Sequence, residues 1–526
     1  MKAKRTAAVI LAGTMVAAAL AGCGNSAETS TVTTDSGSGA STGDTQKIVL
    51  EYIYFNKVPT DMQLVQDAIN AKTVPDIGVE VEFYPVSFGE ADTQTSLMIS
   101  SGEQLDLVVP FGQSAFLSLI NKNMLEPLDD LLDQYGDNIK EVDKDTLAGG
   151  YVDGKLYGIP SINKVGRTYG YVVRKDILDE VGWTKTEDCT MDDLTELFSK
   201  IKAAHPDMIV VQISAGTPST TTPLYDYFYP NDYLGADPAC GGISGGGLDA
   251  TNTTIENVYK SDNYKKFCET MHEWYQNGYI NADAATNTDT MQSAVEAGAS
   301  AGFFLNTEVD MVPNQTSGIG MEMTAVNTRP HTLMQQDIQG QSMAIPVTSA
   351  NPEAAMKFMN YMFGSKEMVN LFYYGIEGQD YVINDAGEVA YPDGQNAQIV
   401  GYRTVLGLYF DQLKQLTPDY LDTVVRAYAG DSQSNYGDTY SEMCKDYNSE
   451  LNDRNTSKFL GYTYNPNAVK TQYSSVQSVI TQYRPGLETG SVDPDTTIPQ
   501  FISALEAAGI NDIIADNQKS LNDWLK

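Results

Sequence analysis

Aromatic and acidic side chains gather in one short stretch of this chain. The segment "PLYDYFYPNDYLG" (223–235) contains five rings interleaved with two carboxylates: Tyr225, Asp226, Tyr227, Phe228, Tyr229, Asp232 and Tyr233. Rings offer flat apolar faces, and carboxylates and amides offer paired hydrogen bonds, so the combination suits ligands rich in hydroxyl groups. The period-two spacing of Tyr225, Tyr227 and Tyr229 predicts one shared face in an extended segment. That face suits a binding surface or a buried aromatic core equally well.

Catalytic and metal-binding patterns are weak in this sequence. With 69 acidic residues a chance pair of carboxylates is nearly certain, so such pairs do not indicate a glycosidase. The three histidines lie far apart in the sequence, and the spacing of Cys189, Cys240, Cys268 and Cys444 matches no metal motif. Those four cysteines leave both disulfides and free thiols open. We therefore expect no catalytic residue, no metal and no cofactor.

The overall charge limits the class of ligand. The chain has 526 residues and a formal net charge of −36, with acidic residues spread along the sequence. Such a charge disfavours nucleic acid and anionic ligands and favours solubility at an exposed surface.

The N-terminal segment predicts export and attachment to a membrane. Three basic residues precede an apolar stretch (6–20) that is too short to span a bilayer, as in a secretory signal. The "LAGC" sequence that ends at Cys23 resembles the bacterial lipobox, in which the cysteine receives a diacylglycerol. We expect residues 1–22 to be a lipoprotein signal peptide and 23–46, rich in Ser, Thr and Gly, to be a lipid-anchored disordered linker.

Strands and helices alternate after this linker. The hydrophobic patterns predict a β-α-β-α-β series over strands 48–54, 79–84 and 105–109 with helices after Thr60 and over 90–101, followed by a helix over 113–121. This order favours a doubly wound α/β sheet whose ligand crevice lies beyond the carboxyl ends of its strands. The residues at those ends are Tyr54, Phe55, Phe111 and Gln113.

A second α/β series follows a junction at 151–160. Asp153-Gly154 predicts a hairpin turn there. Strands are expected at 169–174 and 208–214, separated by a helix that Thr190 and Asp193 open as a capping box. A later helix begins at Asn351-Pro352, and we expect its apolar stripe to face a core, with these members: Ala355, Phe358, Met359 and Met362.

The order of these segments resembles the family 1 extracellular solute-binding proteins, the maltose-binding-protein-like receptors of bacterial ABC importers. The matching pieces, which run over most of 46–375, are "LMISSGEQLDLVV", "MLEPLDDLL", "VDGKLYGIP", "VVRKDILDEVGW", "MDDLTELFSKI", "AVEAGASAGFF" and "GQSMAIP" followed by "NPEAAMKFM". The segments "IEGQDYVI" (376–383) and "FISALEAAGINDIIADNQKSLNDWL" (501–525) resemble a Gram-positive subgroup with an extra C-terminal domain of unknown function.

The resemblance implies a two-lobed periplasmic-binding-protein-like fold of type II, with a doubly wound sheet in each lobe and hinge strands between the lobes. By analogy, lobe 1 comprises 47–159 and 335–375. Lobe 2 comprises 160–334 and 376–526, including a C-terminal helical extension.

The expected ligand site combines the strand ends with the aromatic segment. Its residues are Tyr54, Phe55, Phe111, Gln113, Tyr169, Tyr225, Tyr227, Asp232, Tyr233, Glu308 and Gln379. Glu308 is included because "FFLNTE" resembles the family strand whose following loop reaches the cleft. Tyr171 and Tyr381 are further candidates.

Together these features predict a lipid-anchored, extracytoplasmic receptor that delivers a carbohydrate, an oligosaccharide by our interpretation, to the permease of an ABC transporter. We expect a monomer with no nucleic-acid partner. A peptide or amino-acid derivative is the alternative ligand. A sensor or adhesion lipoprotein with no transporter shares every one of these features.

Overall fold

The structure, a computed structural model, describes residues 45–526 with these gaps: 55–56, 111–112, 142–146, 161–165, 215–222, 288, 309–310, 340–341, 384–388, 396–399, 403–448 and 453. Contacts group Asp44–Lys526 into one unit. The signal peptide and Cys23 lie outside the described residues, as do Phe55, Phe111 and Cys444.

Two parallel strands form the centre of the first lobe. Strand β1 (Gln46–Tyr54) pairs with β2 (Val79–Ser87) in register from Gln46↔Val79 to Tyr54↔Ser87, and helix α1 (Met62–Ile77) connects them. The sheet continues through a parallel bridge from Leu50 to Leu107. The β-α-β-α-β prediction is confirmed, although the third strand is reduced to a bridge. The lobe's other helices are α2 (Ala91–Ser101), α3 (Gln113–Asn121), α4 (Asp129–Tyr135), α12 (Pro352–Phe363) and α13 (Lys366–Tyr374).

The predicted hairpin lies at the junction. Strands β3 (Tyr151–Val152) and β4 (Lys155–Leu156) pair antiparallel. Asp153 and Gly154 between them both have positive φ, 51° and 74°, as a type I′ turn requires. Next, β5 (Ile159–Pro160) pairs antiparallel with β12 (Ser342–Met343), so the outgoing and returning segments of the chain run side by side.

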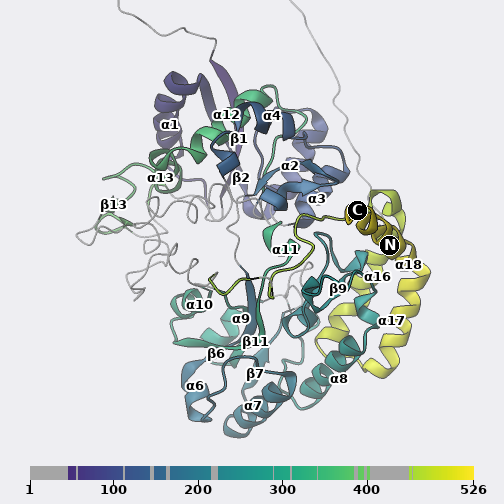
Figure 1. The fold of residues 1–526 in the computed structure, drawn as a ribbon. Helices are drawn as coiled ribbons and strands as arrows, with labels where there is room; N and C mark the ends of the chain where they lie inside the picture. The colour runs from purple at the N-terminus through teal and green to yellow at the C-terminus, as the bar shows by residue number, and fades with distance from the viewer. Residues whose placement is uncertain are drawn as a thin grey trace, which may run out of the picture. The chain divides into compact units, whose positions relative to one another are not determined.

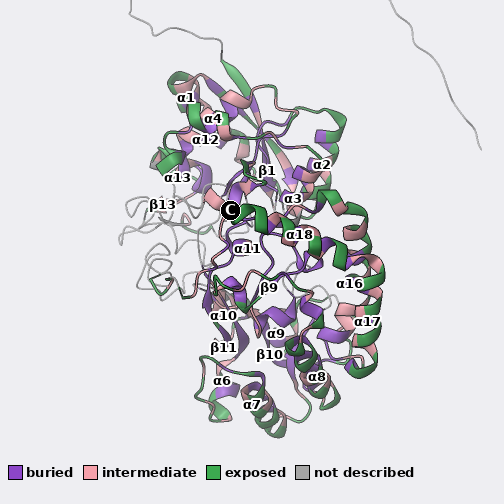
Figure 2. Ribbon diagram, turned by 45° about the vertical axis from the view of Figure 1, so that its right-hand side comes forward, coloured by how far each residue is buried: buried purple, intermediate pink, exposed green. Residues whose placement is uncertain are grey.

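The second lobe has a four-stranded mixed sheet in the order β11-β6-β10-β7. Its strands are β6 (Arg167–Arg174), β7 (Ile209–Gln212), β10 (Ser300–Asn306) and β11 (Met323–Thr332). Strand β6 runs antiparallel to both β10 and β11, whereas β7 is parallel to β10. Figure 2 shows β10 and β11 largely buried beneath the surrounding helices.

The helices of this lobe are α6 (Lys175–Glu180), α7 (Met191–Ala204), α8 (Asp262–Gln276), α9 (Met291–Glu296), α10 (Met311–Ile319) and α11 (Gln335–Ile338). The predicted capping box opens α7: the Thr190 hydroxyl accepts from the Asp193 amide at 3.2 Å, and Asp193 accepts from the Thr190 amide at 2.8 Å. The shorter elements are η1 (Phe88–Glu90), η2 (Ile139–Glu141), η3 (Ala148–Gly150), η4 (Leu224–Tyr227), η5 (Pro238–Cys240), η6 (Gly245–Gly247), η7 (Val258–Lys260), η9 (Pro466–Val469), β8 (Asn231–Asp232), β9 (Ile243–Ser244), β13 (Val382–Ile383) and β14 (Val389–Ala390).

Three C-terminal helices belong to the second lobe's core: α16 (Lys470–Glu488), α17 (Pro494–Ala508) and α18 (Ile510–Trp524). Phe501 is fully buried there, with its ring 5.0 Å from that of Tyr259. Figure 1 shows these helices in yellow, with α16 and α17 beside α8. Beyond Gly375, Ile376 and Tyr402 pack with the first lobe's core.

The methionine-rich face of α12 is core, as predicted. Ala355, Phe358, Met359 and Met362 are all fully buried. The thiols of Cys189, Cys240 and Cys268 are buried and free, so no disulfide joins these three. No helix in the described part of the chain has the length and apolar character needed to cross a bilayer.

Candidate functional site

Side chains from distant parts of the sequence meet at one edge of the second lobe's sheet. Strand β6 begins at Arg167, and its antiparallel neighbour β10 ends at Asn306. The antiparallel register places the start of β6 beside the carboxyl ends of β10 and β11, with Tyr169 opposite Asn306 and Arg167 opposite Thr332. Glu308 follows β10 by two residues and therefore lies at the same edge.

An ion-pair network fills this edge. The Arg167 guanidinium contacts a Glu308 carboxylate oxygen, and its Nε lies 3.8 Å from Asp337 Oδ1 in α11. Both carboxylate side chains are less than 10% exposed. Burial raises the pKa of Asp337 to about 6, although Arg167 and Arg329 both oppose that shift. The network links the second lobe's sheet to the segment that leads back to the first lobe.

One oxygen of this network has no partner in the part of the chain that the structure describes. Asn306 Nδ2 donates to Glu308 Oε1 at 2.5 Å, but Glu308 Oε2 is buried with no hydrogen-bond partner among the described residues. A buried acceptor without a partner is costly, and hydroxyl groups are suitable donors for it.

Tyr169 is the aromatic member of this edge. Its ring lies 4.4 Å from that of Tyr227, and the Arg329 guanidinium lies over the Tyr169 ring, 4.8 Å from its centre. Tyr169 is 7% exposed. The structure thus brings together three of the predicted residues: Tyr169, Tyr227 and Glu308.

On the first lobe, Gln113 opens α3 with its side chain buried. Gln113 Nε2 donates to Gln339 Oε1 at 3.0 Å, and Gln339 Nε2 donates to Thr463 Oγ1 at 2.8 Å. This chain of hydrogen bonds joins α3, the returning segment and the C-terminal region. Tyr54, also of the first lobe, is half-buried at the end of β1.

The aromatic segment 223–235 lies inside the second lobe's core. The expectation of an extended face is wrong, because Leu224–Tyr227 forms the 3₁₀ helix η4. Tyr225, Tyr227 and Tyr233 are at most 5% exposed, and packing is the role that their contacts indicate. Asp232 is fully buried, and its carboxylate accepts from the Ser457 hydroxyl and the Leu234 amide.

Gln379 lies elsewhere. It is exposed, and its Nε2 donates to Asp61 Oδ2 at 2.8 Å, next to α1. Nothing in these contacts joins it to the ion-pair network. Phe55 and Phe111 lie outside the described residues, so ligand contact by either stays a prediction.

Sequence reasoning did not find Arg167, Asp337 and Gln339. Arg167 is the first residue of a correctly predicted strand region, and a basic residue at a strand end in an acidic chain was an available signal. Asp337 and Gln339 have no comparable local pattern. No group of three or more His, Cys, Asp or Glu side chains among the described residues is arranged to hold a metal ion.

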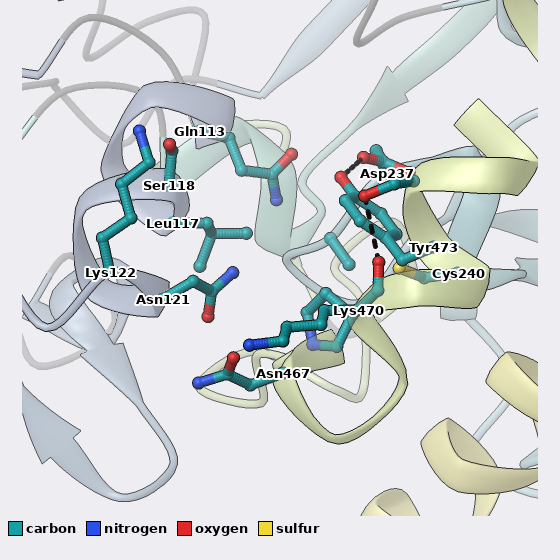
Figure 3. A pocket seen from close by; sticks show the side chains of 13 residues that line it. Gln113, Leu117, Ser118, Asn121, Lys122, Asp237, Cys240, Asn467, Lys470 and Tyr473 are labelled. Atoms are coloured by element: carbon teal, nitrogen blue, oxygen red, sulfur yellow. Dashed lines mark hydrogen bonds between the residues drawn. The ribbon is translucent and has the colours of Figure 1, made fainter. Parts of the chain in front are cut away.

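A cavity of about 360 Å³ extends from Gln113 along α3. Its opposite wall comes from η5 and the start of α16, so two lobes line it (Figure 3). This volume is within the range of small-molecule sites.

The profile of the family described as bacterial extracellular solute-binding protein matches residues 55–369, more than half of the chain. The chain belongs to this family. A second profile, a domain of unknown function (DUF3502), matches residues 458–526 and so covers α16, α17 and α18. The predicted resemblance is confirmed in both parts.

Two relatives of this solute-binding protein align with most of its length. A carbohydrate ABC transporter substrate-binding protein from Streptococcus pneumoniae serotype 4 (strain ATCC BAA-334 / TIGR4) is 24% identical over 97% of this chain and 96% of its own. The polygalacturonan/rhamnogalacturonan-binding protein YtcQ from Bacillus subtilis (strain 168) is 23% identical over 64% of this chain and 68% of its own.

A solved structure has the same fold. The N-glycan transport solute-binding protein NgtS from Streptococcus pneumoniae superposes with a TM-score of 0.69 at 21% identity, covering 91% of this chain and 99% of its own. Its complexes with Man1GlcNAc and Man5GlcNAc superpose with TM-scores of 0.66 and 0.65, each at 19% identity over 91% of this chain and over 100% and 98% of their own. The predicted type II two-lobed fold is confirmed.

Proposed function

We propose that this protein is the substrate-binding lipoprotein of an ABC transporter and that it captures an oligosaccharide between its lobes for delivery to the permease. The observation that carries the proposal is the match to a carbohydrate ABC transporter substrate-binding protein over 97% of the chain. The NgtS complexes supply a precedent for a glycan on the same fold.

The geometry supports a hydroxyl-rich ligand. Glu308 and Tyr169 on the second lobe and Gln113 on the first provide an acceptor, a ring and an amide at the facing edges of the lobes. The Glu308 oxygen without a described partner is a site for one sugar hydroxyl. In this proposal the protein binds as a monomer, uses no cofactor and leaves the ligand chemically unchanged.

A thermal-shift screen tests the ligand class. The panel contains mono- and oligosaccharides, with dipeptides and longer peptides as the comparison. Ligand at 100 times its Kd stabilises the folded state by about 2.7 kcal/mol, so an oligosaccharide should raise the melting temperature clearly. A rise with peptides alone would overturn the carbohydrate assignment.

A further inference from the structure

We propose that the cavity between α3 and α16 holds one sugar unit of the bound oligosaccharide, so that the C-terminal domain of unknown function forms part of the ligand site. The inference rests on the proposed function and assigns a role to residues 458–526.

The position of the cavity is the first argument. Gln113 lines the cavity and also joins the hydrogen-bonded chain through Gln339 that connects the lobes. The cavity therefore shares Gln113 with that hydrogen-bonded chain and extends along α3 towards the C-terminal helices. An oligosaccharide that contacts Gln113 would extend into this cavity.

Hydrogen bonds to Asp237 tether the wall that the C-terminal domain contributes. Asp237 is buried, and its Oδ2 accepts from the Tyr473 hydroxyl and from Gln477 Nε2 at 2.5 Å. Its Oδ1 accepts from the Ala239 amide at 2.8 Å. With both oxygens engaged by protein donors, Asp237 holds the Tyr473 side chain in place at the cavity.

Lys470 supplies an exposed ammonium donor at this cavity. In Figure 3 its side chain reaches across the cavity towards Asn121 of α3. Lys470 forms no ion pair within the part of the chain that the structure describes, although the chain has 69 acidic residues and only 33 basic ones. An ammonium group in that position can donate to sugar hydroxyls or to a sugar carboxylate.

The facing wall contributes Asn121 of α3. Asn121 Oδ1 is buried, and it has no hydrogen-bond partner among the described residues. Leu117, one turn earlier on α3, adds an apolar surface. Donor, acceptor, amide and apolar contact in a cavity of about 360 Å³ are what one sugar ring requires.

Variants from each wall test the proposal. Isothermal titration calorimetry would measure the affinity for malto-, manno- and xylo-oligosaccharides of two to six units. Oligogalacturonates of the same lengths provide the acidic ligands for comparison. Lys470→Ala and Asn121→Ala should each weaken the longer members of the bound series about tenfold, because each loses a hydrogen bond to the ligand. Lys519→Ala, an exposed lysine on α18 away from the cavity, is the matched control and should bind like wild type.

The outcomes separate the two proposals. Without ligand, both variants should have the same melting temperature as the Lys519→Ala control, and this result would exclude a folding defect. If Lys470→Ala loses more affinity for oligogalacturonates than for neutral chains, a sugar carboxylate lies at Lys470. If it loses more affinity for neutral chains, a sugar hydroxyl lies there. If both variants bind every length as tightly as wild type, the sugar subsite is overturned while the proposed function stands. If wild type binds no oligosaccharide at all, the proposed function itself fails.

Discussion

Glu51 is a carboxyl group buried at the centre of the first lobe. It is 1% exposed; one oxygen accepts from the Thr95 hydroxyl and the other from the Val109 amide at 3.0 Å. Burial raises its pKa from 4.5 to about 7, a shift that the two hydrogen bonds oppose. The folded state therefore holds this proton more tightly than the unfolded chain does. The associated stability is complete below about pH 4.5 and is lost as the pH rises through 7.

Glu51→Gln should remove this pH dependence, since glutamine keeps an acceptor oxygen and does not ionise. Between pH 5 and pH 8 the free energy of unfolding of the wild type should fall by about 2 to 3 kcal/mol relative to that of the variant. Urea unfolding at both pH values measures this difference, with the exposed Glu103→Gln as control. If the free energy of unfolding differs between wild type and Glu51→Gln by the same amount at both pH values, the Glu51 carboxyl does not titrate in this range.

At the scale of the element, the N-terminal segment carries the prediction about location. We propose that Cys23 carries a diacylglycerol, because "LAGC" resembles a lipobox and a polar linker follows. Two acyl chains give stable anchoring, whereas one chain gives marginal binding. Cys23→Ala should therefore appear in the culture medium, measured by fractionation and immunoblot. Wild-type levels of the variant in the membrane fraction would contradict the anchor.

Elements with local chemistry were predictable from the sequence, and contacts between elements were not. The turn at Asp153-Gly154 and the capping box at Thr190 depend on neighbouring residues alone, and both predictions are confirmed. Arg167 and Glu308 are 141 positions apart, and only the register of β6 against β10 brings them together. The prediction of an extended face for the tyrosines of 223–235 was wrong for a related reason. Period-two spacing cannot distinguish an extended face from a 3₁₀ turn inside a core.

At the scale of the whole molecule, the described residues that join the lobes include one pair of very short strands. The paired strands β5 and β12 have two residues each, and the Gln113–Gln339–Thr463 hydrogen bonds add neutral side-chain contacts. Short connections of this kind can absorb a rotation of one lobe against the other. A ligand that contacts both lobes has more partners in the closed form, so it shifts the population towards closure by its difference in affinity for the two states.

Ligand binding should therefore change the shape of the protein and leave the ligand intact. Small-angle X-ray scattering at saturation with an oligosaccharide that raises the melting temperature should give a smaller radius of gyration than the free protein. A saccharide that causes no thermal shift is the control and should leave the radius unchanged. Mass spectrometry of the released ligand should recover its original mass, because the proposed output to the permease is closure alone. An unchanged radius at saturation would argue for a rigid binding or adhesion protein, and a cleaved ligand would argue for a glycosidase.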